Sequence, residues 1–329
     1  MRYIKLLSIL LIAGLTACEK EISFDEVAPD ALLVVNGLQQ VGQPAYLCVE
    51  RSSNYIETEH DFRVKDLHAD LYVNGVFKET LQVRDSIIME TYINWNGGNE
   101  IEEELMKYAF NYCEGTYILC EGDELRFEIS SSEFDKVAVA ETTMPYAPNV
   151  ISLDTIRTEG TLMDGQTVYF SLHIDDPSGK DYYNLYPKDG LDGFTSSDPV
   201  FNDFMNIVHV DDLFGNSDYY GHGEYNLFTD AYFDGTSYSV SMKVYCQSMA
   251  GQYTEPFTVE VSRVDDGFYQ YKKSMNTYYY NDFGILGLVT EPTQVYSNVQ
   301  NGVGLVGAQS EAVTITVDLT ENGERKTEN

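Results

Sequence analysis

The chain has 329 residues, and its 53 acidic against 20 basic side chains give a formal net charge of −33 at pH 7. This charge excludes nucleic-acid binding as a main function, because affinity for phosphate backbones comes from Lys and Arg. With 43% hydrophobic residues the composition is that of a globular protein, and the length allows one large or two ordinary domains.

The first 17 residues have the pattern of a lipoprotein signal peptide. Arg2 and Lys5 form a basic start, residues 6–12 form an apolar run, and small residues lead into Cys18. The run is too short to cross a bilayer. We therefore expect cleavage before Cys18 and diacylation of this cysteine, so that the lipid is the whole membrane attachment.

Residues 18–29 predict a polar acidic tether between the lipid and the folded part. Glu19, Glu21, Asp25 and Glu26 follow the cysteine, interrupted by Lys20. This acidic run resembles the surface-export signal of Bacteroidota lipoproteins, which favours display on the cell surface. The alternative is an ordinary linker that faces the periplasm.

Residues 30–145 predict a first domain of about seven antiparallel strands, similar to an immunoglobulin-like sandwich. Apolar and polar residues alternate with period two, and turn signals such as Asn74-Gly75 separate the runs. One segment differs, because residues 99–102 read as a capping box and Ile101, Leu105 and Tyr108 then recur at helical spacing. We expect a short helix there.

Cys113 and Cys120 are candidates for a disulfide. Only six residues separate them, and an exported protein folds in an oxidising compartment. The spacing is not that of a C-x-x-C zinc or redox site.

Residues 146–149 predict a linker, because Pro145 and Pro148 interrupt strand pairing. Beyond it, residues 150–320 predict a larger β domain, in which Val168, Phe170 and Ile174 belong to one alternating face. A short helix is expected near residues 266–279, and residues 321–329 are expected to form a flexible tail. The whole chain is therefore predicted to be all-β, with two antiparallel sandwich-like domains and one or two short helices.

Two clusters of acidic residues could bind calcium, the one cofactor that the sequence suggests. Clustered carboxylate oxygens in loops are the ligands that this ion prefers. The first cluster comprises Asp211, Asp212, Asn216 and Asp218, and the second comprises Asp175, Asp176 and Asp181. Neither matches an EF-hand, and the alternative is that both are turn residues with solvated charges.

The sequence gives little indication of an enzyme. The chain contains no H-E-x-x-H and no G-x-S-x-G segment, so we expect no catalytic residues. Gly302, Gly304 and Gly307 satisfy the spacing of a dinucleotide fingerprint, but the residues that follow alternate like a strand. Close backbone packing or a tight turn is the better explanation of these glycines.

Several motifs resemble domain-of-unknown-function family 4249, a family of Bacteroidota lipoproteins. The most specific resemblance is in residues 268–273 and 291–308, and weaker ones are in residues 33–37, 115–117 and 140–145. The resemblance implies an outer-membrane lipoprotein encoded near a TonB-dependent receptor. It implies no activity and no catalytic residues.

From this resemblance we expect an accessory protein that helps such a receptor to capture or admit a ligand. The alternatives are a free-standing surface adhesin or structural lipoprotein and, third, a surface hydrolase. Residues 291–308 carry a single ionisable acid or base, Glu291, so Tyr296 and Asn298 are candidate interface residues or core residues. Ser86 and Thr155 resemble the O-glycosylation acceptors of this phylum and are expected beside turns or the linker.

Overall fold

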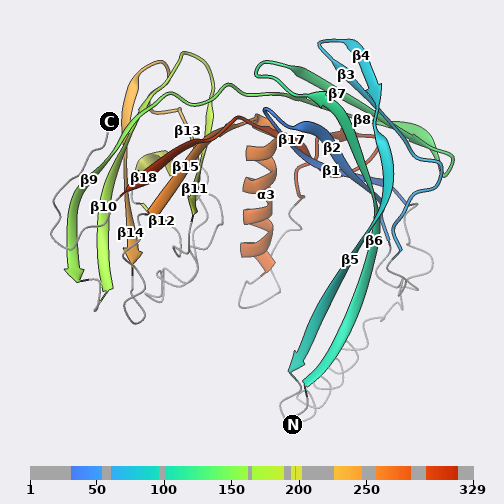
Figure 1. The fold of residues 1–329 in the computed structure, drawn as a ribbon, viewed down its shortest axis with the longest axis horizontal. Helices are drawn as coiled ribbons and strands as arrows, with labels where there is room; N and C mark the ends of the chain where they lie inside the picture. The colour runs from blue at the N-terminus through green and yellow to red at the C-terminus, as the bar shows by residue number, and fades with distance from the viewer. Residues whose placement is uncertain are drawn as a thin grey trace, which may run out of the picture.

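The computed structural model describes residues 31–53, 61–95, 101–161, 165–188, 194–196, 198–201, 226–246, 257–282 and 294–317. The predicted signal peptide, tether and tail lie outside these residues. The described strands form three sheets of nine, four and five strands (Figure 1).

The strands are antiparallel with one exception, the parallel pair β1 and β17. The nine-stranded sheet has the order β13 (Asn226–Thr229), β11 (Tyr182–Lys188), β15 (Phe257–Val264), β17 (Val306–Gln309), β1 (Leu33–Gln40), β2 (Pro44–Arg51), β6 (Ile101–Ile118) and β5 (Gln82–Trp95), with β18 (Val313–Val317) also on β15. The four-stranded sheet has the order β12 (Phe194–Thr195), β14 (Ser237–Cys246), β10 (Gly165–Asp175) and β9 (Val150–Thr161). The five-stranded sheet has the order β16 (Val299–Gln300), β8 (Phe134–Thr143), β7 (Glu124–Ser131), β3 (His68–Val73) and β4 (Val76–Thr80).

The first core lies between one end of the nine-stranded sheet and the five-stranded sheet. Every second residue of β7 is buried, as half-buried strands require. Phe127 and Ile129 of this strand share the core with Leu47 of β2 and Cys113 of β6. The all-β class and the sandwich-like packing are thereby confirmed.

The second core lies between the other end of the nine-stranded sheet and the four-stranded sheet. Phe170, Leu172 and Ile174 of β10 are fully buried against Tyr183 of β11 and Val261 of β15, among other residues. These β10 residues form the face that the period-two pattern predicted.

The C-terminal segment crosses back over the boundary expected at residues 146–149. β16 pairs with β8, β17 pairs with β1, and Val299, Val306 and Ala308 are buried in the first core. Val299, Val306 and Ala308 therefore belong to the first core, although they follow the expected boundary, whereas Leu305 packs in a smaller cluster with Phe268 and Tyr269 of α3. The reason is that strand pairing depends on the matching of edges in space and not on chain order.

The helix expected around residues 101–112 is wrong. These residues belong to β6, which pairs with β5 without a register shift from Gln82 opposite Glu114 to Trp95 opposite Ile101. The helical spacing of apolar residues was misleading because a paired neighbour overrides local propensity. The second expected helix is confirmed as α3 (Asp266–Asp282).

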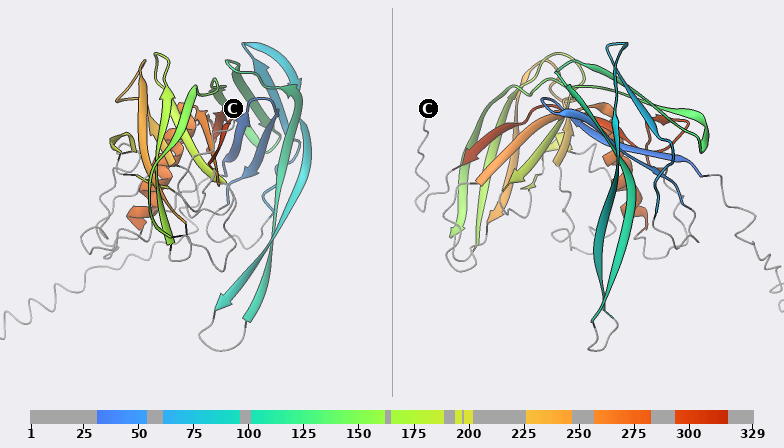
Figure 2. Two further views of the ribbon diagram at one scale, coloured as in Figure 1. Left: turned by 60° about the vertical axis from the view of Figure 1, so that its left-hand side comes forward. Right: turned by 45° about the vertical axis from the view of Figure 1, so that its right-hand side comes forward.

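Helix α3 lies beside β17 and between the two groups of strands (Figure 1). The hairpin of β5 and β6 extends beyond the other described strands in every view (Figures 1 and 2). A short 3-10 helix (Pro199–Phe201) packs its apolar residues into the second core. No helix of the described residues has the length and hydropathy needed to cross a membrane.

Candidate functional site

Asp265 is the centre of the junction between α3, β17 and β8. It precedes the helix and accepts hydrogen bonds from the backbone N–H groups of Gly267 and Phe268, both at 3.2 Å, which makes it the N-cap. The same carboxylate accepts from the N–H of Ala308 at 2.7 Å and from the hydroxyl of Thr142 at 2.9 Å. One side chain therefore joins three elements that are far apart in the sequence.

Asn298 holds the same edge of β17 at Val306, two residues before Ala308. Its side-chain amide donates to the carbonyl oxygen of Val306 at 2.8 Å and accepts from the N–H of that residue at 3.0 Å. It also donates to the carbonyl oxygen of Glu141 at 3.2 Å. Tyr296 is half-buried beside α3, and its backbone N–H donates to the Ser274 hydroxyl at 2.8 Å. Both candidate interface residues thus make internal contacts.

The three glycines of the apparent dinucleotide fingerprint allow close packing. A Cβ atom on Gly304 would lie 2.2 Å from the carbonyl oxygen of Val35, and one on Gly302 would lie 2.8 Å from that of Leu33. Gly304 also has a φ of +120°, which side chains disfavour. Close backbone packing, the better explanation at the sequence level, is confirmed.

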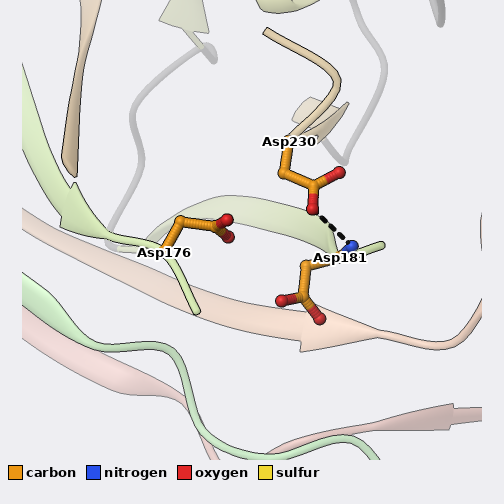
Figure 3. A group of neighbouring side chains, drawn as sticks. All are labelled: Asp176, Asp181 and Asp230. Carbon is orange, nitrogen blue, oxygen red and sulfur yellow. Dashed lines mark hydrogen bonds between the residues drawn. The ribbon is translucent and has the colours of Figure 1, made fainter. Parts of the chain in front are cut away.

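A cluster of three carboxylates lies at the end of the second core (Figure 3). Asp176 follows β10, Asp181 precedes β11, and Asp230 follows β13, so three strand ends meet there. One ligand oxygen from each residue lies within 4.8 Å of the others. The sequence predicted that Asp176 and Asp181 are close, but Asp230 was missed because 49 positions separate it from Asp181.

Asp175 of the predicted cluster does not belong to this group. Its carboxylate accepts hydrogen bonds from the Ser237 hydroxyl at 2.8 Å and from the Asn149 side chain at 3.2 Å. Successive residues of a strand face opposite sides, which separates Asp175 from Asp176.

Each carboxylate of the cluster has a partner within the protein. Asp176 accepts from the Tyr183 hydroxyl at 2.5 Å and from the N–H of Gly235 at 2.9 Å. Asp181 forms an ion pair with Arg263, whose side chain is only 10% exposed. Asp230 accepts from the backbone N–H of Asp181 at 2.8 Å.

The surroundings of Asp230 favour its protonated form. Burial, together with the charges of Asp176 and Asp234, raises the pKa of Asp230 to about 6. The oxygen atoms suit a calcium ion, but Arg263 already supplies a positive charge to Asp181. An internal network of carboxylates and one arginine therefore accounts for the arrangement, and sequence reasoning missed Arg263 because nothing local distinguishes it.

Asp154, His173 and Ser239 form a contact that resembles a hydrolase triad on the face of the four-stranded sheet. The Nδ1 atom of His173 lies 2.6 Å from the Ser239 hydroxyl, and Nε2 lies 3.2 Å from the Asp154 carboxylate. In serine hydrolases Nε2 faces the serine and Nδ1 faces the aspartate, so the roles are reversed here. His173 and Ser239 are direct partners across β10 and β14, and cross-strand pairing explains the contact.

An open groove of about 1140 Å³ lies at the base of the β5–β6 hairpin. Arg63 donates to the carboxylates of Asp61 at 2.7 Å and Asp85 at 2.8 Å. The hydrogen bonds from Arg63 lower the pKa of Asp61 to about 2. The arginine thus holds the segment that precedes β3 against the base of β5, and a charged ligand would have to compete with these ion pairs.

The other candidate sites are placed as follows. Cys18 and the cluster of Asp211, Asp212, Asn216 and Asp218 lie outside the described residues. Cys113 is buried in the first core, whereas Cys120 is exposed, and both are free, so the expected disulfide is not formed.

Ser86 and Thr155 lie inside β5 and β9, so the expectation that they sit beside turns is wrong. O-glycosylation of these two residues stays a prediction.

The model of one protein family, described as Domain of unknown function (DUF4249), matches residues 19–315. This range includes every residue of the described sheets except the last two of β18. No curated protein matches the chain at a significant level.

Proposed function

The chain belongs to the DUF4249 family, and from this premise we propose that it is a lipid-anchored accessory protein of the outer membrane that assists a TonB-dependent receptor in ligand capture or uptake without catalysis. The lipid on Cys18 would supply the attachment, because the acyl chains partition into the bilayer. The acidic tether after Cys18 supports display on the cell surface of a member of the Bacteroidota.

The observation that carries a binding role is the β5–β6 hairpin. Its strands are 14 and 18 residues long, and much of its length extends beyond both cores (Figure 2). Among the residues whose burial is described, the base of the hairpin contributes Cys113 to the first core and packs Val83 against it. Long projecting elements of this kind commonly contact partners.

The internal contacts of the junction and of the acidic cluster support a role for both in stability. Asp265, Asn298 and Asp176 all have hydrogen-bond partners within the chain. The docking surface proposed for Tyr296 and Asn298 from charge depletion therefore has less support than the hairpin.

Co-purification tests this proposal. The full chain with a C-terminal tag is solubilised from membranes in mild detergent, and the bound proteins are identified and quantified. A receptor barrel in a stoichiometric amount is the expected result. The Cys18→Ala variant is the control for the anchor, and it should leave the membrane fraction because the lipid is lost. If the Cys18→Ala variant stayed in the membrane fraction after a high-salt wash, that result would contradict lipid anchoring.

Two outcomes would favour the alternatives. A membrane-anchored protein that purifies without any stoichiometric partner would favour a free-standing adhesin or structural lipoprotein. Covalent labelling of the wild type by a fluorophosphonate, which is lost in Ser239→Ala, would favour a surface hydrolase and contradict the non-catalytic proposal.

A further inference from the structure

We propose that the outer edge of β5 is a docking site for an extended segment of a partner protein, in which an apolar centre is flanked by Lys or Arg. This inference deepens the proposed function, because it names the element that contacts the partner. It rests on the backbone geometry of the hairpin and on its charge.

The hydrogen bonds of neighbouring strands show which main-chain groups of β5 face outward. The N–H of Phe62 donates to the carbonyl oxygen of Ala109 at 2.9 Å, so the main-chain groups of Ala109 point away from β5. Ala109 is paired with Ile87, and in an antiparallel pair this makes Ile87 a non-hydrogen-bonded partner. The N–H and C=O of Ile87 therefore point away from β6, toward the outer edge.

Every second residue of β5 directs its main-chain N–H and C=O groups toward the same outer edge. Met89, Thr91 and Ile93 follow Ile87 at this spacing, and the register with β6 has no shift that would change it. The N–H of Leu81, just before the strand, confirms the alternation, since it donates outward to the carbonyl oxygen of Ala69 at 2.8 Å. After this contact, β5 is the last strand of its sheet among the described residues.

Within the described residues, the outer part of this edge lacks three common protections against pairing, namely a short strand, a bulge and a Lys or Pro residue. Exposed edge strands are commonly short, bulged or interrupted by Lys or Pro. β5 is 14 residues long, its register is continuous, and residues 86–95 contain neither Lys nor Pro. Ile87 is 50% exposed and Ile88 is 45% exposed, on opposite faces of the strand. An extended peptide can add to such an edge through main-chain hydrogen bonds and pack against both isoleucines.

The acidic charge of the hairpin favours a basic partner segment. Residues 86–95 of β5 and 101–110 of β6 carry four acidic residues, Glu90, Glu102, Glu103 and Glu104, and one base, Lys107. A second copy of the chain would bring the same acidic residues and a net charge of −33 to the contact. Like charges brought together weaken binding, whereas Lys or Arg flanks complement the hairpin.

A designed peptide tests the edge directly. The probe is a ten-residue peptide of alternating valine and threonine with two lysines at each end, added to the full mature chain. Amide exchange measured by NMR should show new protection at Ile87, Met89, Thr91 and Ile93, while the even-numbered amides of β5 are protected with and without peptide. Exchange at these four residues that the peptide leaves unchanged would overturn the proposal.

Two controls separate strand addition from attraction by charge alone. The same peptide with an N-methyl group on every backbone amide keeps its charge but has no N–H to donate from either edge, so its affinity should fall by about tenfold or more. Ile87→Pro removes an outward N–H without removing a bond to β6, and it should weaken the unmodified peptide by a similar factor. Equal binding of the methylated peptide would overturn the proposal even if the proline variant failed to fold.

Two further results distinguish this inference from the proposed function. Dimers of the wild type that Ile87→Pro dissociates would identify a second copy as the occupant and overturn the choice of partner. Full recovery of a receptor by a folded Ile87→Pro variant would overturn the edge as its contact and leave the accessory function standing. Peptide binding without any co-purified receptor would leave the edge standing and contradict the accessory function.

Discussion

The junction around Asp265 and the β5–β6 hairpin use main-chain hydrogen bonds in opposite ways. At the junction, a carboxylate, an amide side chain and close-packed glycines satisfy the backbone of α3, β8 and β17 from within the chain. Along the outer side of β5, every second main-chain group faces away from the sheet. The first region closes the fold, and the second leaves pairing capacity for another molecule.

The segments that resemble the family lie mostly at the junction around Asp265. Residues from four of the resembling segments meet at or beside the junction, including Asn36, Thr142, Phe268 and Ala308. The hairpin carries only residues 115–117, at the base of β6, whereas residues 82–95 and 101–114 carry none of these motifs. The motifs that identify the family thus describe how the chain closes, and they are a poor guide to what it binds.

The largest effect on stability is expected from Gly304→Ala at the junction. The new Cβ would meet the carbonyl oxygen of Val35 at 2.2 Å, and the φ of +120° would be strained as well. We expect the free energy of unfolding to fall by about 4 kcal/mol. Chemical denaturation measures it.

Gly42→Ala is the matched control, because Gly42 has a φ of +81° but no atom within 4 Å of a new Cβ. It should cost only about 1 kcal/mol. Equal losses in the two variants would show that close packing at Gly304 is not what the junction requires.

A loss of about 3 kcal/mol is expected for Asp265→Ala, because the N-cap and the hydrogen bonds to Ala308 and Thr142 disappear together. Asp265→Ser keeps a capping oxygen but cannot span the junction, so it should recover only part of the loss. Thermal and chemical unfolding of both variants measure the difference. Full recovery in the serine variant would reduce the role of Asp265 to capping.

Asp230→Asn should change how stability depends on pH. Because the pKa of Asp230 is raised from 3.8 to about 6, the folded state holds its proton while the unfolded state has lost it. The free energy of unfolding of the wild type therefore falls as pH rises from 3.8 to about 6. The uncharged asparagine removes that slope, so the variant should be more stable than the wild type above pH 6 and similar to it below 3.8. Parallel stability curves would contradict this assignment.

The smallest effect on stability is expected at the hairpin. Ile87→Lys places a charge on a side chain that is already 50% exposed, so the free energy of unfolding should change by less than about 0.5 kcal/mol. The valine and threonine peptide should nevertheless bind more weakly, because lysine protects edges from pairing. Val76→Lys, at a 60% exposed valine in β4, controls for the added charge. A large loss of stability in Ile87→Lys would place this residue in a core.

The sequence predicted local features well where one pattern decided the structure. The alternation through Phe170, Leu172 and Ile174 identified the buried face of β10, and the helix expected near residues 266–279 corresponds to α3. It failed for residues 101–112, where apolar spacing indicated a helix but pairing with β5 produced a strand.

For the candidate site, the sequence correctly predicted that Asp176 and Asp181 lie close together. Asp230 and Arg263 could not be predicted, because strands β13 and β15 bring them there from distant positions.

The sequence by itself therefore determined the strand character, the second helix, the tight packing of the glycines and the family. Local periodicity and conformational limits of single residues are enough for these. Only the tertiary structure decided that Val299, Val306 and Ala308 join the first core, that Asp265 joins three elements and that β5 is the last strand of its sheet among the described residues. These features depend on which strands meet in space, and nothing in the neighbouring sequence records that choice.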